Sequence, residues 1–263
     1  MVNSLEKIFR DTRRFYETDD ELKKAIEFTR THQRLYFSGD EIECGERKSF
    51  DTKIIVSKKR SFDAARSYRG EKIGVLNFAN SFTPGGGVLY GARAQEESLC
   101  RISTLYAALT ANEMMMDFYS RHIADENPLG TDDVIFSPRV VVFRSDDSEM
   151  RLLDKSEWFE ADVLTCAAPD LGEFRISDER LFSLHERRWR QILSVARANG
   201  CTVLILGAFG CGAFHNNPEV VANAARASLA DFRGDFKAIE FAVACKSDWT
   251  NYDVFSRILG NGI

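Results

Sequence analysis

The chain has 263 residues, and 35 Lys and Arg residues against 40 Asp and Glu residues give it a formal net charge of −5. This length is enough to bury a sizeable core, and we expect one domain rather than two small ones. The acidic balance disfavours DNA binding and other sequence-independent nucleic-acid binding, which depend on a basic surface, but it allows a polyanion to be held in one cleft.

The sequence carries no pattern of a membrane protein or a zinc protein. It has no uncharged apolar stretch of about eighteen residues and no charged-then-apolar N-terminus typical of a signal peptide. The cysteines show no C-x-x-C spacing and the four histidines are dispersed, so we expect no metal site. Most cysteines lie in apolar runs, which fits reduced thiols in a soluble cytoplasmic protein. The six are Cys44, Cys100, Cys166, Cys201, Cys211 and Cys245.

Residues 1–46 have a charged, helical pattern that predicts an extension packed on a catalytic domain formed by residues 47–263. The spacing of a helix N-cap occurs twice, at Asn3 with Glu6 and as a capping box in Thr18–Glu21. Apolar residues in the second helical segment supply a face for packing. We therefore expect two helices in this extension.

The next segments alternate between the patterns of strand and helix. Ile54–Val56 predicts a short strand, and Lys72–Asn77 predicts another. Between them, Ser61 can cap a helix that runs through Tyr68 and stops at Gly70. This alternation is typical of an α/β sheet.

A glycine-rich loop and a helix follow the second strand. Gly85–Gly87 come directly after Pro84, and without side chains their backbone N–H groups can approach an anion such as phosphate. Gln95–Glu97 then fall in the first turn of a helix that we expect to continue to Met114–Met116. A loop that only held an anion would carry Lys or Arg here, so two carboxylates suggest chemistry on a sugar. The alternative is a plain turn with a charge pair at a helix N-terminus.

The middle of the chain predicts loops and further strands. Asp117–Asp133 is polar and predicts a loop, and Val140–Phe143 predicts a buried strand with Pro138 at its edge. Asp146–Trp158 is acidic and irregular, and we interpret it as plain surface rather than as a lid beside a cleft. Other elements are expected at Ala161–Pro169 (strand), from a cap at Ser177 to Asn199 (helix), at Ala238–Cys245 (strand) and at Trp249–Leu259 (helix).

A second glycine loop begins where a strongly apolar strand ends. Thr202–Leu206 predicts a central parallel strand, and Gly207–Asn216 follows it, at the edge of the sheet where open α/β folds bind ligands. Asn217 and Pro218 then fit the cap and first position of a helix. The G-x-x-G-x-G spacing is not the dinucleotide fingerprint, and there is no P-loop lysine, which disfavours an oxidoreductase or an NTPase.

These motifs resemble those of a known family. Gly85–Gly87, seven residues and Gln95–Glu97 resemble the GGG-x(6–8)-QEE signature of the poly(ADP-ribose) glycohydrolases. Asn77–Asn80 resembles the Asn-Ala-Ala-Asn of macrodomains, with Phe78 as in the compact microbial branch of the hydrolases. The second loop resembles their diphosphate-binding loop, in which an aromatic residue at the position of Phe214 lies beside the nucleotide.

The resemblance implies a three-layer, macrodomain-like α/β fold with a mixed sheet of six or more strands and an N-terminal helical addition. It implies hydrolysis of ribose–ribose bonds in poly(ADP-ribose) with release of ADP-ribose, with poly(ADP-ribose) and ADP-ribosylated proteins as partners and no metal or redox cofactor. Glu97 would be the general acid and base, Glu96 would hold ribose hydroxyls, and Gln95 and Asn80 would contact the riboses. The diphosphate would be held by the backbone at Gly85, Gly86, Gly87, Gly210, Cys211, Gly212, Ala213 and Phe214.

Other interpretations stay open at this point. A macrodomain that binds ADP-ribose without cleaving it has no reason to keep two acids against an anionic ligand, and another ADP-ribosyl hydrolase remains a further possibility. Phe214 could fill the core, although its place between three glycines and a helix cap favours a ligand contact.

Overall fold

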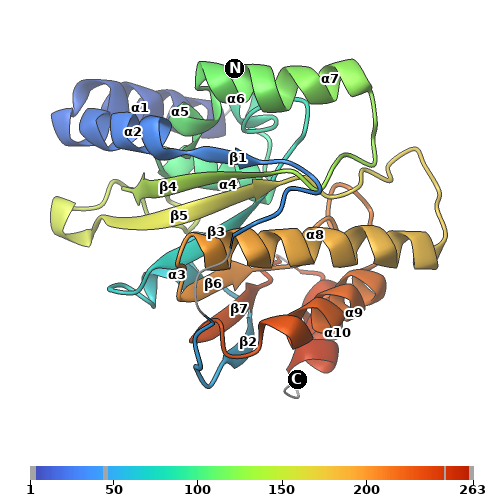
Figure 1. Ribbon diagram of the computed structural model, residues 1–263. Coiled ribbons are helices and arrows are strands. Elements are labelled where there is room, and N and C mark those ends of the chain that lie inside the picture. The colour runs from blue at the N-terminus through green and yellow to red at the C-terminus, as the bar shows by residue number, and fades with distance from the viewer. Residues whose placement is uncertain (1–3, 44–46, 246, 261–263) are drawn as a thin grey trace.

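A computed structural model describes residues 4–43, 47–245 and 247–260, in which one mixed sheet lies between two layers of helices (Figure 1). The strand order is β1-β4-β5-β3-β6-β7-β2. Strands β5, β3, β6, β7 and β2 run parallel, whereas β4 and β1 complete one edge in antiparallel pairing. The predicted mixed sheet of at least six strands is confirmed. The strands are β1 (Arg34–Tyr36), β2 (Lys53–Ser57), β3 (Ile73–Phe78), β4 (Val134–Val142), β5 (Phe159–Cys166), β6 (Val203–Leu206) and β7 (Ala238–Ala242).

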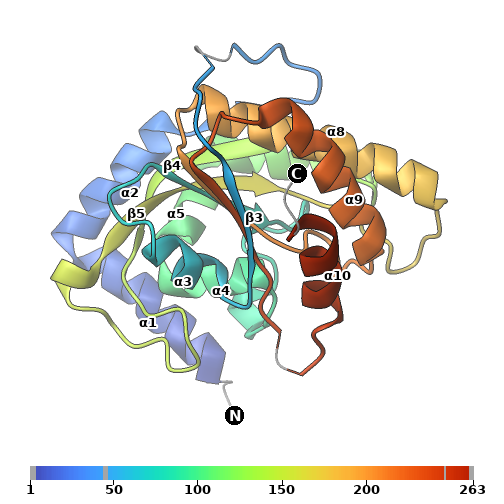
Figure 2. The same cartoon turned by 90° about the horizontal axis from the view of Figure 1, so that it is seen from below.

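Helices cover both faces of the sheet, as Figures 1 and 2 show from two directions. Neighbouring strand residues such as Val75 and Leu76 are both fully buried and belong to different apolar clusters, because successive side chains point to opposite faces. One cluster includes buried side chains of α8, α9 and α10, and the other includes buried side chains of α1, α3 and α4. The helices are α1 (Ser4–Thr18), α2 (Asp20–His32), α3 (Ser61–Arg66), α4 (Gln95–Ile102), α5 (Leu105–Leu109), α6 (Asn112–Met114), α7 (Arg121–Asp125), α8 (Asp178–Ala198), α9 (Pro218–Leu229) and α10 (Thr250–Leu259), with short η1 (Val88–Tyr90), η2 (Met115–Ser120), η3 (Lys155–Glu157) and η4 (Ala230–Phe232).

Several predicted caps are confirmed. The Ser177 side chain accepts a hydrogen bond from the N–H of Arg180 at the start of α8. The Asn217 side chain accepts a hydrogen bond from the N–H of Glu219 at the start of α9, where Pro218 is the first helical residue. Both arrangements satisfy N–H groups that a helix leaves unpaired at its first turn. Within the described residues, none of the helices combines the length and apolar character needed to cross a bilayer.

The N-terminal segment differs from its prediction in two respects. Arg34–Tyr36 forms strand β1, where only helix was expected, because the open edge of β4 offers it backbone partners. The cap of α2 is Asp19, whose carboxylate accepts from two N–H groups of the first turn, whereas Thr18 bonds back to the carbonyl of Arg14. The predicted cap at Asn3, Cys44 and the boundary at Glu46 lie outside the described residues.

The helix that carries the glutamate pair is also shorter than predicted. It ends at Ile102, and Ser103 is extended with φ −144° and ψ −179°. The N–H of Thr104 donates to the carbonyl of Val141, and that of Phe143 donates to the carbonyl of Ile102, so the end of β4 competes for backbone groups the helix would use. The Asp117–Asp133 segment, predicted as a loop, begins with the rest of η2 and α7.

Strand β4 starts earlier than predicted, at Val134, so Pro138 lies inside it instead of at its edge. Its pairing with β5 shifts register between Ser137 and Val140. Arg139 takes φ +54° there, and its N–H donates to the Asp162 carboxylate. A bulge is the usual way for a strand to hold a proline, which has no N–H to donate.

Candidate active site

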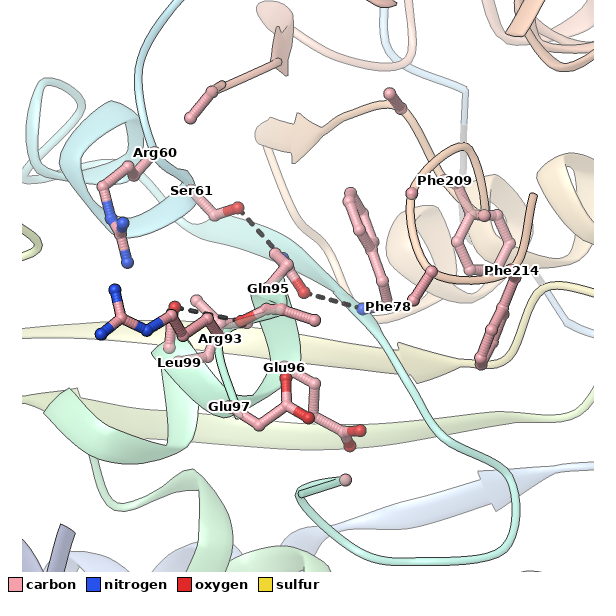
Figure 3. Close-up of a pocket in the computed structure, with 18 of the residues that line it drawn as sticks. Arg60, Ser61, Phe78, Arg93, Gln95, Glu96, Glu97, Leu99, Phe209 and Phe214 are labelled. Carbon is pink, nitrogen blue, oxygen red and sulfur yellow. Dashed lines mark hydrogen bonds between the residues drawn. The ribbon is translucent and has the colours of Figure 1, made fainter. Parts of the chain in front are cut away.

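A cavity of about 460 Å³ opens where the parallel strands β3, β6 and β7 end at their carboxyl side. Its walls come from the first glycine loop with the start of α4, from the second glycine loop, and from the segment after β7 (Figure 3). Ten of the predicted site residues line it: Asn80, Gly86, Gly87, Gln95, Glu96, Glu97, Gly210, Gly212, Ala213 and Phe214. Gly85 and Cys211 belong to the same two loops but do not line the cavity.

The Glu97 carboxylate is the group best placed for chemistry. Its side chain lines the cavity, and the residue is only 6% exposed. Oε1 accepts a hydrogen bond of 2.9 Å from the N–H of Gly87, which fixes the orientation of the carboxylate. Oε2 is buried and has no hydrogen-bond partner among the described residues. Since a buried unpaired oxygen is costly, this atom is suited to a partner supplied by a ligand.

The neighbouring Glu96 carboxylate is held within the protein. Its Oε2 accepts from the N–H of Asn80 at 2.8 Å, and its Oε1 accepts from Asn77 Nδ2 at 3.2 Å and from the N–H of Gly85 at 3.3 Å. Burial raises the pKa of Glu96 to about 8, while these donors favour the charged form. The two acids therefore differ: Glu96 ties α4 to the loop, and Glu97 keeps one oxygen free.

The glycines of the first loop are required by the glutamate beside them. Gly86 has φ +55°, and a Cβ there would lie 2.5 Å from Glu97 Oε1. The triplet's N–H groups are all used inside the protein: Gly85 bonds Glu96, Gly86 bonds the carbonyl of Thr83, and Gly87 bonds Glu97. This use differs from the predicted one, in which these N–H groups faced a diphosphate.

The amide side chains at the start of the site are also engaged. Gln95 Oε1 accepts from the N–H of Phe78 at 2.9 Å, and Nε2 donates to Ser61 Oγ at 3.0 Å (Figure 3). Nε2 also donates to the carbonyl of Leu76 at 2.7 Å. Asn80 Oδ1 accepts from two N–H groups of the loop that follows it. Gln95 thus joins α4 to β3 and α3.

The second glycine loop presents free backbone donors. The N–H groups of Gly210, Gly212, Ala213 and Phe214 make no hydrogen bond within the described residues, whereas that of Cys211 donates to the carbonyl of Ala208. Consecutive free N–H groups form a concave site suited to an anion. Phe214 is half-buried: it lines the cavity and also packs against the core.

The cavity is also lined by residues that no sequence motif indicated, including Arg60, Arg93 and Asp146. Asp146 was assigned to plain surface, but its carboxylate accepts from Arg60 Nε at 2.5 Å and from the N–H of Phe62 at 3.0 Å. It caps α3 in place of Ser61, which is the first residue of that helix. No local pattern could reveal this, because Asp146 lies 84 residues from Phe62. Among the described residues, no group of three or more His, Cys, Asp or Glu side chains is arranged to hold a metal ion.

Comparisons with known proteins place these features in one family. A family profile described as microbial-type PARG, catalytic domain, matches residues 6–145. The structure is similar to a poly(ADP-ribose) glycohydrolase from Thermomonospora curvata bound to the inhibitor ADP-HPD, with 32% identity, a TM-score of 0.83 and coverage of 97% of this chain and 98% of that chain. It is also similar to the enzyme from Deinococcus radiodurans in complex with ADP-ribose, with 32% identity, a TM-score of 0.80 and coverage of 90% and 97%.

A search of curated proteins found no match. The structural similarity nevertheless extends over nearly the whole chain, at an identity above 30%, and the α/β fold is the macrodomain-like one that the motifs predicted. The glycine triplet and glutamate pair lie within the part matched by the profile. This chain belongs to the microbial-type poly(ADP-ribose) glycohydrolase (PARG) family.

Proposed function

We propose that this chain hydrolyses the ribose–ribose glycosidic bonds of poly(ADP-ribose) and releases ADP-ribose. The observation that carries the proposal is the carboxyl group of Glu97, a residue that lines the cavity, with Oε1 fixed by the Gly87 N–H and Oε2 buried and unpaired among the described residues. A module that only binds ADP-ribose gains nothing from a second carboxylate against an anionic ligand. The proposed partners are poly(ADP-ribose) and ADP-ribosylated proteins in the cytoplasm, without DNA binding.

In the proposed mechanism Glu97 acts first as an acid and then as a base. Its proton moves to the leaving ribose oxygen as the bond to the anomeric carbon breaks, which leaves an oxocarbenium-like centre. Water attacks that carbon, and its proton returns to Glu97, so the enzyme is restored. The diphosphate of the substrate and the exclusion of water both favour the protonated form of a nearby carboxyl group.

The other site residues have proposed roles in binding. The free N–H groups of Gly210, Gly212, Ala213 and Phe214 hold the diphosphate, and Phe214 lies beside the nucleotide. Gly86 and Gly87 shape the wall next to the reacting ribose. Glu96 keeps its loop in place and uses its remaining lone pairs for ribose hydroxyls, and Gln95 and Asn80 place the backbone around the riboses.

The test is to incubate the protein with radiolabelled poly(ADP-ribose) and to resolve the products. Wild type is expected to release ADP-ribose. Glu97→Gln keeps the bond from Gly87 but has no proton to give, so the rate should fall by at least about 10² while ADP-ribose binding persists. Glu113→Gln, on an exposed position of α6, is the matched control and should behave as wild type.

Two outcomes would overturn the proposal. If wild type binds ADP-ribose but leaves the polymer intact, the chain is a binding module. If Glu97→Gln cleaves the polymer at the wild-type rate, the acid is another group.

A further inference from the structure

One buried side chain joins two walls of the cavity without lining it. Asn216 is 2% exposed and is the last residue of the second glycine loop. Its Nδ2 donates to the carbonyl of Phe214 at 2.9 Å and to the carbonyl of Pro169 at 2.7 Å. Pro169 belongs to the segment after β5, in which Ala168 lines the cavity. The amide thus connects the segments that follow β5 and β6, which are separated in the sheet by β3.

The same residue closes the loop at its other end. The backbone N–H of Asn216 donates to the carbonyl of Gly210 at 3.0 Å. The free N–H groups of Gly212, Ala213 and Phe214 therefore lie between two points that Asn216 holds. The carbonyl of Phe214 accepts a second bond, from the N–H of Leu171 at 3.0 Å, so its backbone is held from both sides.

A buried histidine determines how the Asn216 amide is oriented. Both contacts of Nδ2 are carbonyl oxygens, which only accept, so this atom must be the amide nitrogen and Oδ1 must be the acceptor. His185 Nε2, 2.6 Å from Oδ1, must then donate. Burial lowers the pKa of His185 to about 3, and its Nδ1 has no partner among the described residues, which fits a neutral ring with its proton on Nε2.

His185 also contacts the cavity wall from behind. Its ring meets that of Phe209 edge to face, with centroids 5.7 Å apart, and Phe209 lines the cavity. His185 is itself fully buried on α8. The histidine, the asparagine and the loop thus form one continuous set of contacts from α8 to the site.

We propose that Asn216, oriented by His185, is a positioning residue that holds the backbone donors of residues 212–214 and the Phe214 ring in the geometry that receives the substrate diphosphate. This assignment rests on the proposed function. Because Glu97 is held by the other glycine loop, loss of Asn216 should weaken substrate binding much more than the chemical step.

The experiment compares five variants in steady-state hydrolysis of poly(ADP-ribose) and in ADP-ribose binding. Asn216→Ala removes the amide, and Asn216→Asp keeps its shape but cannot donate to the two carbonyls. His185→Leu removes the donor to Oδ1, whereas His185→Gln can still supply an N–H. Leu193→Ala is the control, because Leu193 is buried on the same helix and belongs to the core rather than to this network.

Both Asn216 variants should raise KM and the ADP-ribose Kd at least about tenfold, with kcat changed less than about threefold. His185→Leu should also raise KM and the ADP-ribose Kd. His185→Gln should bring both constants most of the way back to the wild-type values. Wild-type constants in Asn216→Ala, or an equal rise of KM in Leu193→Ala, would overturn the assignment.

Hydrogen exchange of the unliganded proteins separates this inference from the proposed function. The hydrogen-bonded amides of Cys211, His215 and Leu171, which donate within or onto this loop, should exchange faster in Asn216→Ala than in wild type and Leu193→Ala. This holds even if wild type neither binds ADP-ribose nor cleaves the polymer, in which case only the proposed function fails. Unchanged exchange in Asn216→Ala would refute the positioning role.

Discussion

Adjacent glutamates in this site have different environments although both lie in the first turn of α4. Successive residues of a helix point about 100° apart. Glu96 therefore turns toward the backbone of Asn80 and Gly85, whereas Glu97 turns toward Gly87 and the cavity. The charge state of Glu96 is linked to folding, and Glu97 is the residue that we propose acts in the reaction.

Glu96→Gln should change how stability depends on pH. In the folded protein the pKa of Glu96 is raised to about 8 from 4.5, so the native state holds this proton more tightly than the unfolded chain. The resulting stability is fully present below pH 4.5 and is lost as pH rises through about 8. Gln cannot titrate, so the melting temperature of the variant relative to wild type should rise between pH 5 and pH 8, as measured by thermal unfolding in matched buffers. A constant difference over this range would show that Glu96 does not titrate there.

Gly86→Ala should displace the proposed acid. The new Cβ would lie 2.5 Å from Glu97 Oε1, in addition to about 1–2 kcal/mol of backbone strain at φ +55°. Polymer hydrolysis should therefore fall at least tenfold. Gly200→Ala is the control, because Gly200 has φ +74° but no atom within 4 Å of the added Cβ. Gly200→Ala should lose a similar amount of stability through backbone strain and keep its activity. Equal losses of activity in the two variants would show that contact with Glu97 is not the cause.

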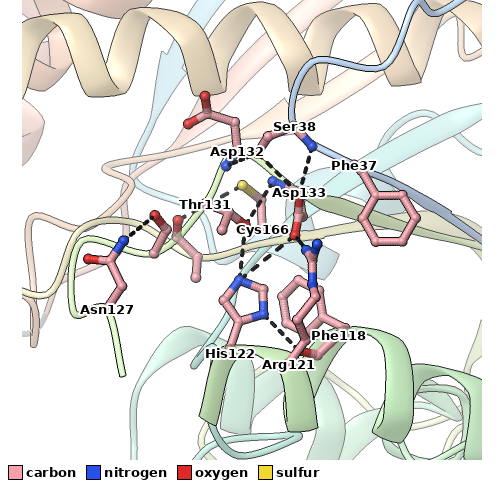
Figure 4. Close-up of polar contacts among 12 residues, drawn as sticks. Phe37, Ser38, Phe118, Arg121, His122, Asn127, Thr131, Asp132, Asp133 and Cys166 are labelled. Atoms are coloured by element: carbon pink, nitrogen blue, oxygen red, sulfur yellow. Dashed lines mark hydrogen bonds and ion pairs between the residues drawn. The ribbon is translucent and has the colours of Figure 1, made fainter. Parts of the chain in front are cut away.

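Among the secondary-structure elements, the chain around β1 is anchored by a buried carboxylate. Asp133 is 1% exposed and lies just before β4 (Figure 4). It accepts from the N–H of Ser38 at 2.7 Å and from Ser38 Oγ at 3.1 Å, and it forms an ion pair with Arg121 of α7. One side chain thus joins three segments: the residues after β1, α7 and the loop before β4.

Asp133→Ala should lower the free energy of unfolding by about 1–3 kcal/mol, because it removes the hydrogen bonds that Ser38 makes to a buried carboxylate. Urea unfolding measures this directly. Arg121→Ala is the comparison, since its side chain is 45% exposed and its loss leaves both Ser38 hydrogen bonds to Asp133 in place, so it should cost less. A smaller loss in Asp133→Ala than in Arg121→Ala would contradict the anchoring role.

In the whole molecule, the N-terminal segment and the rest of the chain share one sheet and one helix layer. We propose that residues 1–46 form an extension packed on a catalytic domain of residues 47–263. Two contacts support the packing: the pairing of β1 with β4, and the hydrogen bond of 2.6 Å from Thr12 Oγ1 to the carbonyl of Arg101 on α4. The extension is thus in direct contact with α4, the helix that carries both glutamates.

ADP-ribose should stabilise the whole molecule, because the walls of the cavity come from segments distant in the chain. A ligand that binds only the folded state adds about 2.7 kcal/mol at a hundred times its Kd. The melting temperature should therefore rise with ADP-ribose concentration as mass action requires. Adenosine, which lacks the diphosphate, is the control and should give a much smaller shift. Equal shifts would argue against a diphosphate site at the second glycine loop.

Local patterns in the sequence were enough to predict the features of the fold and of the site that depend on near neighbours. Ser177 and Asn217 cap their helices through N–H groups two or three residues away. The apolar run that forms β6 predicts a buried parallel strand, and the two glycine loops follow the buried strands β3 and β6. Gln95–Glu97 begin a helix as their spacing indicated. Each of these features arises from backbone geometry or burial over a few consecutive residues.

Only the tertiary structure decided the features that depend on partners far away in the chain. The helix after Glu97 breaks at Ser103 because the end of β4 takes up its backbone groups, and Asp146 caps α3 from 84 residues away. The different environments of Glu96 and Glu97 were also decided by the tertiary structure, because they follow from the N–H groups that each carboxylate accepts hydrogen bonds from. Hydrogen bonding and the cost of burying a charge depend on which groups the fold brings together, and residue spacing alone does not specify them.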